Sequence, residues 1–423
     1  MIIEFNIENC FSFKDKVSFS MLASNIKERF PETNVFDIKN QKLLKTSVIY
    51  GANGSGKTNL FKALLFMRNF VLLSANSVVE NPINPPIFLF STETQELPCF
   101  LELVFISSGI QYRYGFKLNK ASVLSEWLYY VPKDREVKLF VRNEQNIELG
   151  RQFEKEGKPR RDQVNENSLF LSVLAQRNGD MSKGIVKWFA NINMVFSSGD
   201  ILEQSWRGFI LNQINKNDAY VQNNILPFLK ATDLSIENIV PEKMDIPESV
   251  LNTMSDNIKK STLGGIVIKT SHKKYDNKNN YVGDVPIDLM SQESSGTVKL
   301  FYMAAPIISV LKNGGVLLID EMDARLHIDI LKLISNLFHS NNDNKLNAQL
   351  IFNVQDVSLL EEKIFRRDQI WFIKKDKYGK SNIYSLVDYK VRNDSSYKKD
   401  YLNGLYGALP NIGIEEIYSV LDS

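Results

Sequence analysis

Residues 51–58 constrain the fold most strongly, because Gly-Ala-Asn-Gly-Ser-Gly-Lys-Thr matches the complete phosphate-binding pattern G-x-x-x-x-G-K-[ST]. An apolar run precedes this loop at 47–50, and a helix-like run follows it at 59–66. In a strand–loop–helix context, the glycines let backbone N–H groups surround a phosphate at the positive end of the helix. A glycine-rich turn with a chance Lys-Thr pair is the weaker alternative. The pattern predicts a nucleotide site formed by Asn53, Gly54, Ser55, Gly56, Lys57, Thr58 and Asn59.

Within this loop the two residue types have different tasks. We expect Lys57 to reach the β- and γ-phosphates and the Thr58 hydroxyl to bind Mg²⁺. The predicted cofactors are therefore a nucleoside triphosphate and Mg²⁺.

An acidic pair ends an apolar run far downstream, at 314–321, which reads Gly-Gly-Val-Leu-Leu-Ile-Asp-Glu. Such a run suits a central strand of a parallel sheet, buried on both faces. We expect Asp320 to lie beside the phosphate-binding loop and hold Mg²⁺ through water, and Glu321 to orient the attacking water. The alternative is a strand followed by a solvated acidic turn without a role in binding. The phosphate-binding loop earlier in the sequence favours the metal-site interpretation.

A second anion site is predicted at residues 292–297, here called the signature turn, which reads Gln-Glu-Ser-Ser-Gly-Thr. Serine is a good helix N-cap, and glycine allows close approach of a ligand to the helix start. The motif alone would favour an ordinary capped helix. Its place directly before the acidic strand indicates that Ser294 and Gly296 contact a nucleotide.

Together these motifs resemble the ABC-type ATPase heads of SMC and OLD-family proteins. More closely, the chain is similar to ATPases of bacterial abortive-infection and phage-defence loci, the RloA-like group. The resemblance also covers segments spread along the chain, at 1–5, 9–13, 125–129, 167–172, 320–327, 367–372, 384–386 and 401–410.

The resemblance implies an α/β fold, an ABC-type P-loop ATPase head with a mixed central sheet, added antiparallel strands and a helical insertion. It implies ATP and Mg²⁺ as cofactors. In this class the site is split, so Ser294 and Gly296 of one subunit face the ATP held by Lys57, Asp320 and Glu321 of another. The expected partner is therefore a second copy, in a head-to-tail homodimer or a higher homo-oligomer.

One position departs from the group, which usually carries a histidine after the strand that follows the acidic pair. Here that strand is 348–352, and Gln355 stands at the expected place. A glutamine amide can donate a hydrogen bond but cannot carry a proton. We therefore assign catalytic roles to Glu321 and Gln355 and expect tight ATP binding with slow hydrolysis. A loop residue without phosphate contact is the alternative for Gln355.

Composition limits the remaining function classes. Lys plus Arg number 51 and Asp plus Glu 49, so the net charge of +2 gives no global attraction to nucleic acid. Cys10 and Cys99 lack metal-site spacing and read as reduced core residues. No signal peptide is recognisable, and no apolar stretch reaches the ~18 residues that span a bilayer. We expect a cytoplasmic protein with no membrane contact.

Three parts are expected along the chain. Residues 1–168 form an N-terminal ATPase half with the P-loop and an antiparallel sheet, and 169–262 form a helical insertion. Residues 263–423 form a C-terminal half with the signature turn, the acidic (Walker B) strand and the switch region around Gln355. The stretch 143–168 reads as a charged connecting loop, and 271–278 reads as a hairpin tip. Sustained heptads are not recognisable, so long coiled-coil arms are not expected.

The favoured function is an ATP-hydrolysing switch that dimerises around ATP and controls a separate effector protein in anti-phage defence. The alternative is a DNA-repair or chromosome-maintenance head that binds DNA. An OLD-type nuclease is disfavoured, because the residues after Gln355 read as two strands and a Tyr/Gly-rich tail rather than an acidic metal-binding domain.

Overall fold

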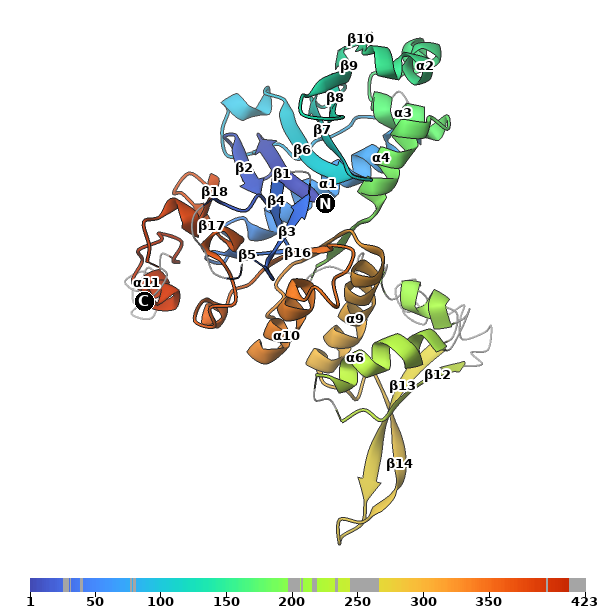
Figure 1. Ribbon diagram of the computed structural model, residues 1–423, viewed down its shortest axis with the longest axis vertical. Helices are drawn as coiled ribbons and strands as arrows, with labels where there is room; N and C mark the ends of the chain where they lie inside the picture. The colour runs from blue at the N-terminus through green and yellow to red at the C-terminus, as the bar shows by residue number, and fades with distance from the viewer. Residues whose placement is uncertain are drawn as a thin grey trace, which may run out of the picture.

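The computed structural model describes residues 1–410 except 26–29, 31, 39–40, 77, 79–80, 197–205, 207, 215–218, 233–234, 244–265 and 393–394. Two large sheets form the body of the molecule, and a smaller sheet ends in a hairpin that projects from it (Figure 1). In the described part of the chain, no helix is long and apolar enough to cross a membrane.

The central sheet carries the motif strands and has six strands. Their order is β11 (Ile192–Val195), β15 (Val316–Ile319), β16 (Gln349–Asn353), β5 (Thr46–Tyr50), β17 (Ile370–Lys375) and β18 (Ser381–Ser385). The first five run parallel, and β18 pairs antiparallel with β17. Every residue of β5, β15 and β16 is buried, as expected for strands covered on both faces. The carboxyl ends of β5, β16 and β15 therefore meet at one edge of the sheet.

Each face of the central sheet packs on a separate core. Ile49 of β5 belongs to the core that contains α1 (Lys57–Leu73), which lies between the two large sheets. Val48 and Tyr50 point the other way, into the core formed with α9 (Ser295–Asn313) and α10 (Ile328–His339). This period-two alternation along β5 produces three layers around the phosphate-binding loop.

The second large sheet is antiparallel and has seven strands. Their order is β10 (Asn146–Leu149), β9 (Val137–Asn143), β8 (Val123–Val131), β7 (Ile110–Leu118), β6 (Cys99–Ser107), β1 (Ile2–Glu8) and β2 (Val17–Ser20). A short separate pair, β3 (Val35–Ile38) and β4 (Gln41–Leu44), lies between β2 and β5 in the sequence. The predicted added antiparallel sheet is confirmed. Cys10 and Cys99 are buried free thiols, also as predicted.

The fold confirms the predicted α/β class with a mixed central sheet, but the segment expected to be a helical insertion is not wholly helical. After α3 (Phe170–Gln176) and α4 (Asp180–Ala190), β11 enters the central sheet beside the acidic strand. Later in the segment, α6 (Leu226–Lys230) precedes β12 (Asn238–Lys243), which pairs with β13 (Ile266–Tyr275). Within this segment, residues 197–205, 207, 215–218, 233–234 and 244–262 lie outside the described residues.

Two smaller expectations are also corrected. The stretch 143–168 is not a plain loop, because it contains β10, the short helix α2 (Glu154–Gly157) and 3-10 turns. The predicted hairpin tip at 271–278 is mostly strand, since β13 continues to Tyr275 and pairs with β14 (Tyr281–Asp288). Among the remaining helices, α11 (Tyr397–Leu402) packs near β17 through its tyrosines.

A buried ion pair anchors α3 to the antiparallel sheet. Glu126 on β8 and Arg142 on β9 are both fully buried, with 3.7 Å between their charged groups. Glu126 also accepts hydrogen bonds from the backbone N–H groups of Phe170 and Leu171 at the start of α3, at 2.7 and 3.0 Å. Burial raises the pKa of Glu126, and the nearby Arg142 opposes that shift. The carboxylate thus completes the N-terminus of α3.

We expect Glu126→Ala to lower the free energy of unfolding by about 3–5 kcal/mol, because it leaves the Arg142 guanidinium buried without its counter-charge. Urea denaturation followed by circular dichroism measures this loss. The matched control is Glu148→Ala on β10, whose pair with Lys138 at 2.8 Å is solvent-exposed, and which should change stability little. Similar losses in both variants would contradict the role of burial.

Candidate functional site

The phosphate-binding loop lies between β5 and α1, at the carboxyl edge of the central sheet. Gly56 has φ 114°, in the region that favours glycine, and a Cβ there would lie 2.7 Å from Ser12 Oγ and closer still to Ser381 Oγ. Ser381 Oγ donates to the Ser55 carbonyl at 2.5 Å, and Ser381 N donates to the Ser12 carbonyl at 2.7 Å. Ser12 near the N-terminus and Ser381 near the C-terminus therefore both pack against the loop.

The loop has the polar groups and the space that a phosphate needs. The Oγ atoms of Ser12 and Ser55 are buried and have no hydrogen-bond partner. Asn53 and Gly54 at the loop apex are exposed, and Thr58 and Asn59 are partly exposed. Buried unpaired hydroxyls are uncommon in folded proteins, because each carries a desolvation cost. Their presence at a glycine-rich helix start fits a loop built to receive anionic oxygens.

Lys57 is folded back onto the loop. Its Nζ donates to the carbonyl oxygens of Gly51 at 2.6 Å and Ala52 at 3.3 Å. Burial lowers the pKa of Lys57, and the acidic residues Asp323, Glu321 and Asp320 partly oppose that shift. The ammonium is thus held beside the loop with only carbonyl dipoles as direct partners, which leaves it able to pair with an anion.

Thr58, the last residue of the loop, and Asp320, which follows β15, form the candidate metal site. Thr58 Oγ1 lies 3.0 and 3.1 Å from the two carboxylate oxygens of Asp320. The Asp320 residue is only 1% exposed, and burial raises the pKa of its carboxyl group while hydrogen bonds from Asn353 and Thr58 oppose the rise. A hydroxyl and a carboxylate that converge at the helix start fit the oxygen ligands that Mg²⁺ prefers.

Glu321 and Gln355 lie together beyond Asp320. Gln355 Nε2 donates to Glu321 Oε1 at 3.1 Å, and both side chains reach solvent. Glu321 has φ 47°, a left-handed conformation that is uncommon for this residue type. It begins the segment 321–325, here called the acidic turn. The structure thus brings the two predicted catalytic residues into direct contact.

The signature turn caps α9. Ser294 is the N-cap residue, and its Oγ accepts a hydrogen bond from Thr297 N at 3.1 Å. A Cβ at Gly296 would lie 2.7 Å from the Arg325 carbonyl oxygen, so the acidic turn packs directly against the signature turn. Within the described residues, no hydrogen bond joins Ser294 or Gly296 to the loop 51–58 of the same chain.

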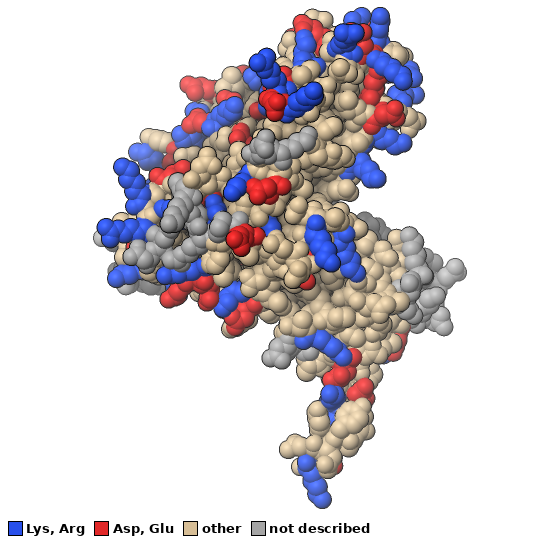
Figure 2. All heavy atoms as spheres, in the orientation of Figure 1, with Lys and Arg blue, Asp and Glu red and all other residues tan. Residues whose placement is uncertain are grey.

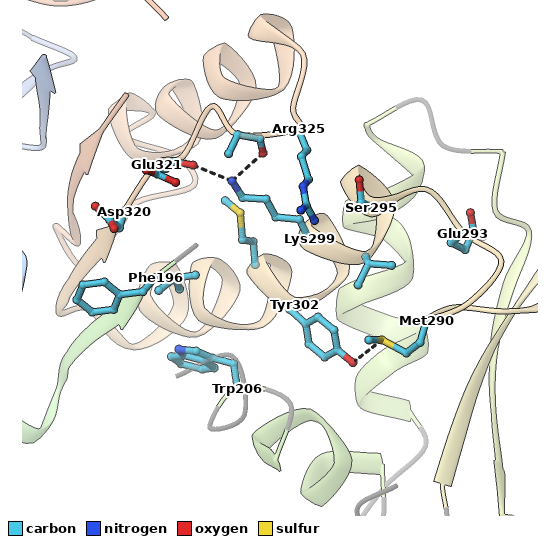
Figure 3. A pocket seen from close by; sticks show the side chains of 14 residues that line it. Phe196, Trp206, Met290, Glu293, Ser295, Lys299, Tyr302, Asp320, Glu321 and Arg325 are labelled. Carbon is cyan, nitrogen blue, oxygen red and sulfur yellow. Dashed lines mark hydrogen bonds between the residues drawn. The ribbon is translucent and has the colours of Figure 1, made fainter. Parts of the chain in front are cut away.

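A cavity of about 410 Å³ lies between α9 and the acidic turn (Figure 3). Lys299 of α9 and Arg325 of the acidic turn border it, and Phe196, Trp206 and Tyr302 line its apolar part. Asp320 and Glu321 border it as well. Asp320 therefore lies between this cavity and Thr58, and Glu321 borders the cavity beside it.

Asn353 is a site residue that the sequence did not reveal. It ends β16, between the two motif strands, and its Nδ2 donates to Asp320 Oδ1 at 2.5 Å. Its Oδ1 accepts from Glu321 N at 2.8 Å. The only sequence signal is its place as the first polar residue after the apolar run 350–352. One buried amide therefore positions both members of the acidic pair.

Lys299 was also not predicted. Its Nζ donates to three backbone carbonyls of the acidic turn, those of Glu321, Met322 and Ala324. Burial lowers the pKa of Lys299 to about 8. Its position three residues after Gly296 gave no signal, because a lysine on a helix usually faces water.

We expect Asn353→Ala to weaken Mg²⁺-dependent nucleotide binding by about 10–100-fold, the range for groups that orient a metal ligand. Removing the Nδ2 donor also raises the pKa of Asp320 further, so binding should need a higher pH than in the wild type. Titration of Mg²⁺ against a fluorescent ATP analogue at several pH values measures both effects.

The control is Asn344→Ala, because Asn344 is also buried and its side chain bonds, among the described residues, to the backbone of Phe338 and Ala348, away from the site. It should lower stability but leave Mg²⁺ affinity and its pH dependence unchanged. Equal metal affinity in wild type and Asn353→Ala would exclude the positioning role of Asn353.

A known protein family matches the part of the chain that holds both motifs. The family model described as "AAA domain, putative AbiEii toxin, Type IV TA system" matches residues 47–361, from the start of the phosphate-binding loop's strand to beyond Gln355. Among solved structures, the chain is similar to the SMC head domain from Thermotoga maritima, with 14% identity and a TM-score of 0.38 over 91% of this chain and 98% of that one. No curated protein matches. Since the family model spans well over half of the chain, the protein belongs to this family of AAA domains.

Proposed function

We propose that this protein is an ATP-binding and ATP-hydrolysing switch that requires Mg²⁺. The observation that carries the proposal is a continuous chain of hydrogen bonds, in which Asn353 joins the predicted pair Thr58 and Asp320 to the predicted pair Glu321 and Gln355. These groups lie at the carboxyl edge of a parallel sheet, the usual ligand edge of α/β folds.

Each residue has a role that follows from its position. Lys57 pairs with the phosphates, and Thr58 and Asp320 hold Mg²⁺, directly and through water. Glu321 accepts a proton from the attacking water, because it is the partly exposed carboxylate next to the metal site. Gln355 donates a neutral hydrogen bond there and cannot transfer a proton, so we expect hydrolysis to be slow.

The complete site is proposed to need two subunits. Ser294 is exposed at the start of α9, where unpaired N–H groups and the helix dipole favour an anion. Since no hydrogen bond among the described residues joins it to the loop of its own chain, we assign it to the γ-phosphate held by a second copy. Donors from both sides would stabilise the charge that develops on the transferred phosphoryl group. ATP would then hold a head-to-tail dimer together.

We further propose that the ATP-bound dimer controls a separate effector in anti-phage defence. The family description, which names a putative toxin of a toxin–antitoxin system, supports this setting. The hairpin β13–β14 is a candidate contact surface for the effector, because it projects from the body (Figure 2). Its Tyr275 and Tyr281 are 54% and 57% exposed. At its base, Thr270 and His272 both contact Glu293 of the signature turn, at 2.5 and 2.7 Å. A change in the signature turn would therefore reach the hairpin.

We expect Lys57→Ala to abolish Mg²⁺-dependent ATP binding, and Glu321→Gln to keep binding but slow hydrolysis by about 10²–10⁴-fold, as for loss of a general base. Glu321→Gln should also accumulate as an ATP-bound dimer. Equilibrium binding, phosphate release and light scattering measure the three quantities. Glu148→Gln is a control, because it removes an exposed carboxylate of the antiparallel sheet, outside the proposed site, and should leave all three quantities unchanged. Unchanged binding in Lys57→Ala would refute the proposed nucleotide site.

We expect Ser294→Arg to abolish hydrolysis by the assembled protein while each subunit still binds ATP. Mixing Ser294→Arg with Lys57→Ala should restore activity, because one mixed site contains an intact loop from the first chain and an intact signature turn from the second. Phosphate release before and after mixing measures the recovery. If the two variants associate and no activity returns, the nucleotide site is not shared between subunits.

A further inference from the structure

Lys299 occupies an unusual position in the molecule. It projects from the second turn of α9, the helix that the signature turn begins. Its Nζ lies 2.8 Å from the Glu321 carbonyl, 3.2 Å from that of Met322 and 2.9 Å from that of Ala324. An ammonium group has three hydrogens, so the acidic turn uses its full donor capacity. Hydrogen bonds from a charged donor are also the stronger kind.

The acidic turn needs such support. Glu321 and Arg325 at its two ends both have positive φ, at 47° and 64°. Non-glycine residues keep this conformation only when their surroundings impose it. The cavity of about 410 Å³ lies against the turn, and Lys299, Glu321, Ala324 and Arg325 border it (Figure 3). On that side, hydrogen bonds from Lys299 hold the turn where close side-chain packing does not.

A second contact joins the same two elements. The Arg325 carbonyl sits against Gly296, where a Cβ would come within 2.7 Å. The signature turn and the acidic turn of one chain therefore behave as a single unit, fixed at Gly296 and at Lys299. Glu321 starts this unit, and its carboxylate contacts Gln355.

We propose that Lys299 is a positioning residue, which fixes the acidic turn to the signature helix of its own chain and so sets the aim of the Glu321 carboxylate. This inference rests on the proposed ATPase function and adds a task that neither motif implies. It predicts that loss of Lys299 impairs chemistry in the site to which the same chain supplies Glu321. Nucleotide binding, which depends on the phosphate-binding loop, should be retained.

The first test replaces Lys299 with methionine, which keeps the length of the side chain and suits the apolar lining of the cavity. We expect the single-turnover rate of ATP hydrolysis to fall at least 10-fold while ATP affinity changes less than 3-fold, since one side chain that aims a general base is lost. Lys299→Arg, which keeps the charge and the N–H donors, should recover part of the rate.

The matched control is Lys312→Met on the same helix, because in the described part of the chain the Lys312 ammonium bonds to Asn224 at the surface, away from the acidic turn, and the variant should leave the rate unchanged. Thermal denaturation of each variant shows whether it is folded. A folded Lys299→Met protein with the wild-type rate would overturn the proposal. A wild type that does not hydrolyse ATP would instead count against the proposed function.

The second test separates the two elements that Lys299 joins, using the mixed dimer with one working site. In that dimer, the Ser294→Arg chain supplies Glu321 and the Lys57→Ala chain supplies the signature turn. Lys299→Met should slow hydrolysis when it is placed in the Ser294→Arg chain and have little effect in the Lys57→Ala chain. Equal losses from both placements, or a loss only in the signature-supplying chain, would show that Lys299 serves the signature turn and would overturn the proposal.

Discussion

The site depends on one buried amide in the middle strand of three. β16 lies between the strands that end in the phosphate-binding loop and in the acidic pair, and Asn353 stands at its carboxyl end. From there its side chain binds the Asp320 carboxylate and the Glu321 backbone at once. Because parallel pairing fixes the register of the three strands, the distance between Thr58 and Asp320 follows from the sheet itself. A shift of β16 by one residue would replace this amide with a core side chain.

Elements distant in sequence are required to keep the loop in shape. The close approach of Ser12 and Ser381 at Gly56 means that the connection between β1 and β2 and the strand β18 both pack against the loop. Larger side chains at these positions would push the loop outward. The chain thus places a small residue at each point where three segments meet, which explains why the antiparallel sheet belongs to the ATPase body.

Sequence motifs predicted the parts of the site that depend on neighbouring residues, and missed the parts that depend on contacts between residues distant in sequence. The loop, its Lys57 and the acidic pair were recognisable because each motif is local and keeps its spacing in sequence. Asn353 was missed because an asparagine after a strand is also typical of a turn. β11 was missed because a four-residue strand flanked by helical patterns gives no clear period. Lys299 could not be found, since its three acceptors are backbone carbonyls that reveal nothing of their role in the sequence.

Burial of the charged groups links nucleotide binding to folding. Lys57 has a pKa lowered by burial, and Asp320 has a pKa raised by it, so the fold disfavours the charged form of both. A phosphate near Lys57 and a divalent cation near Asp320 would each favour the charged form again. The native state therefore gains interactions from Mg²⁺–nucleotide that an unfolded chain cannot make, and binding should stabilise the fold by mass action. Asp320 directly precedes the acidic turn, and Lys299 bonds to that turn, so bound Mg²⁺–nucleotide would also stabilise the turn that links Glu321 to the signature helix.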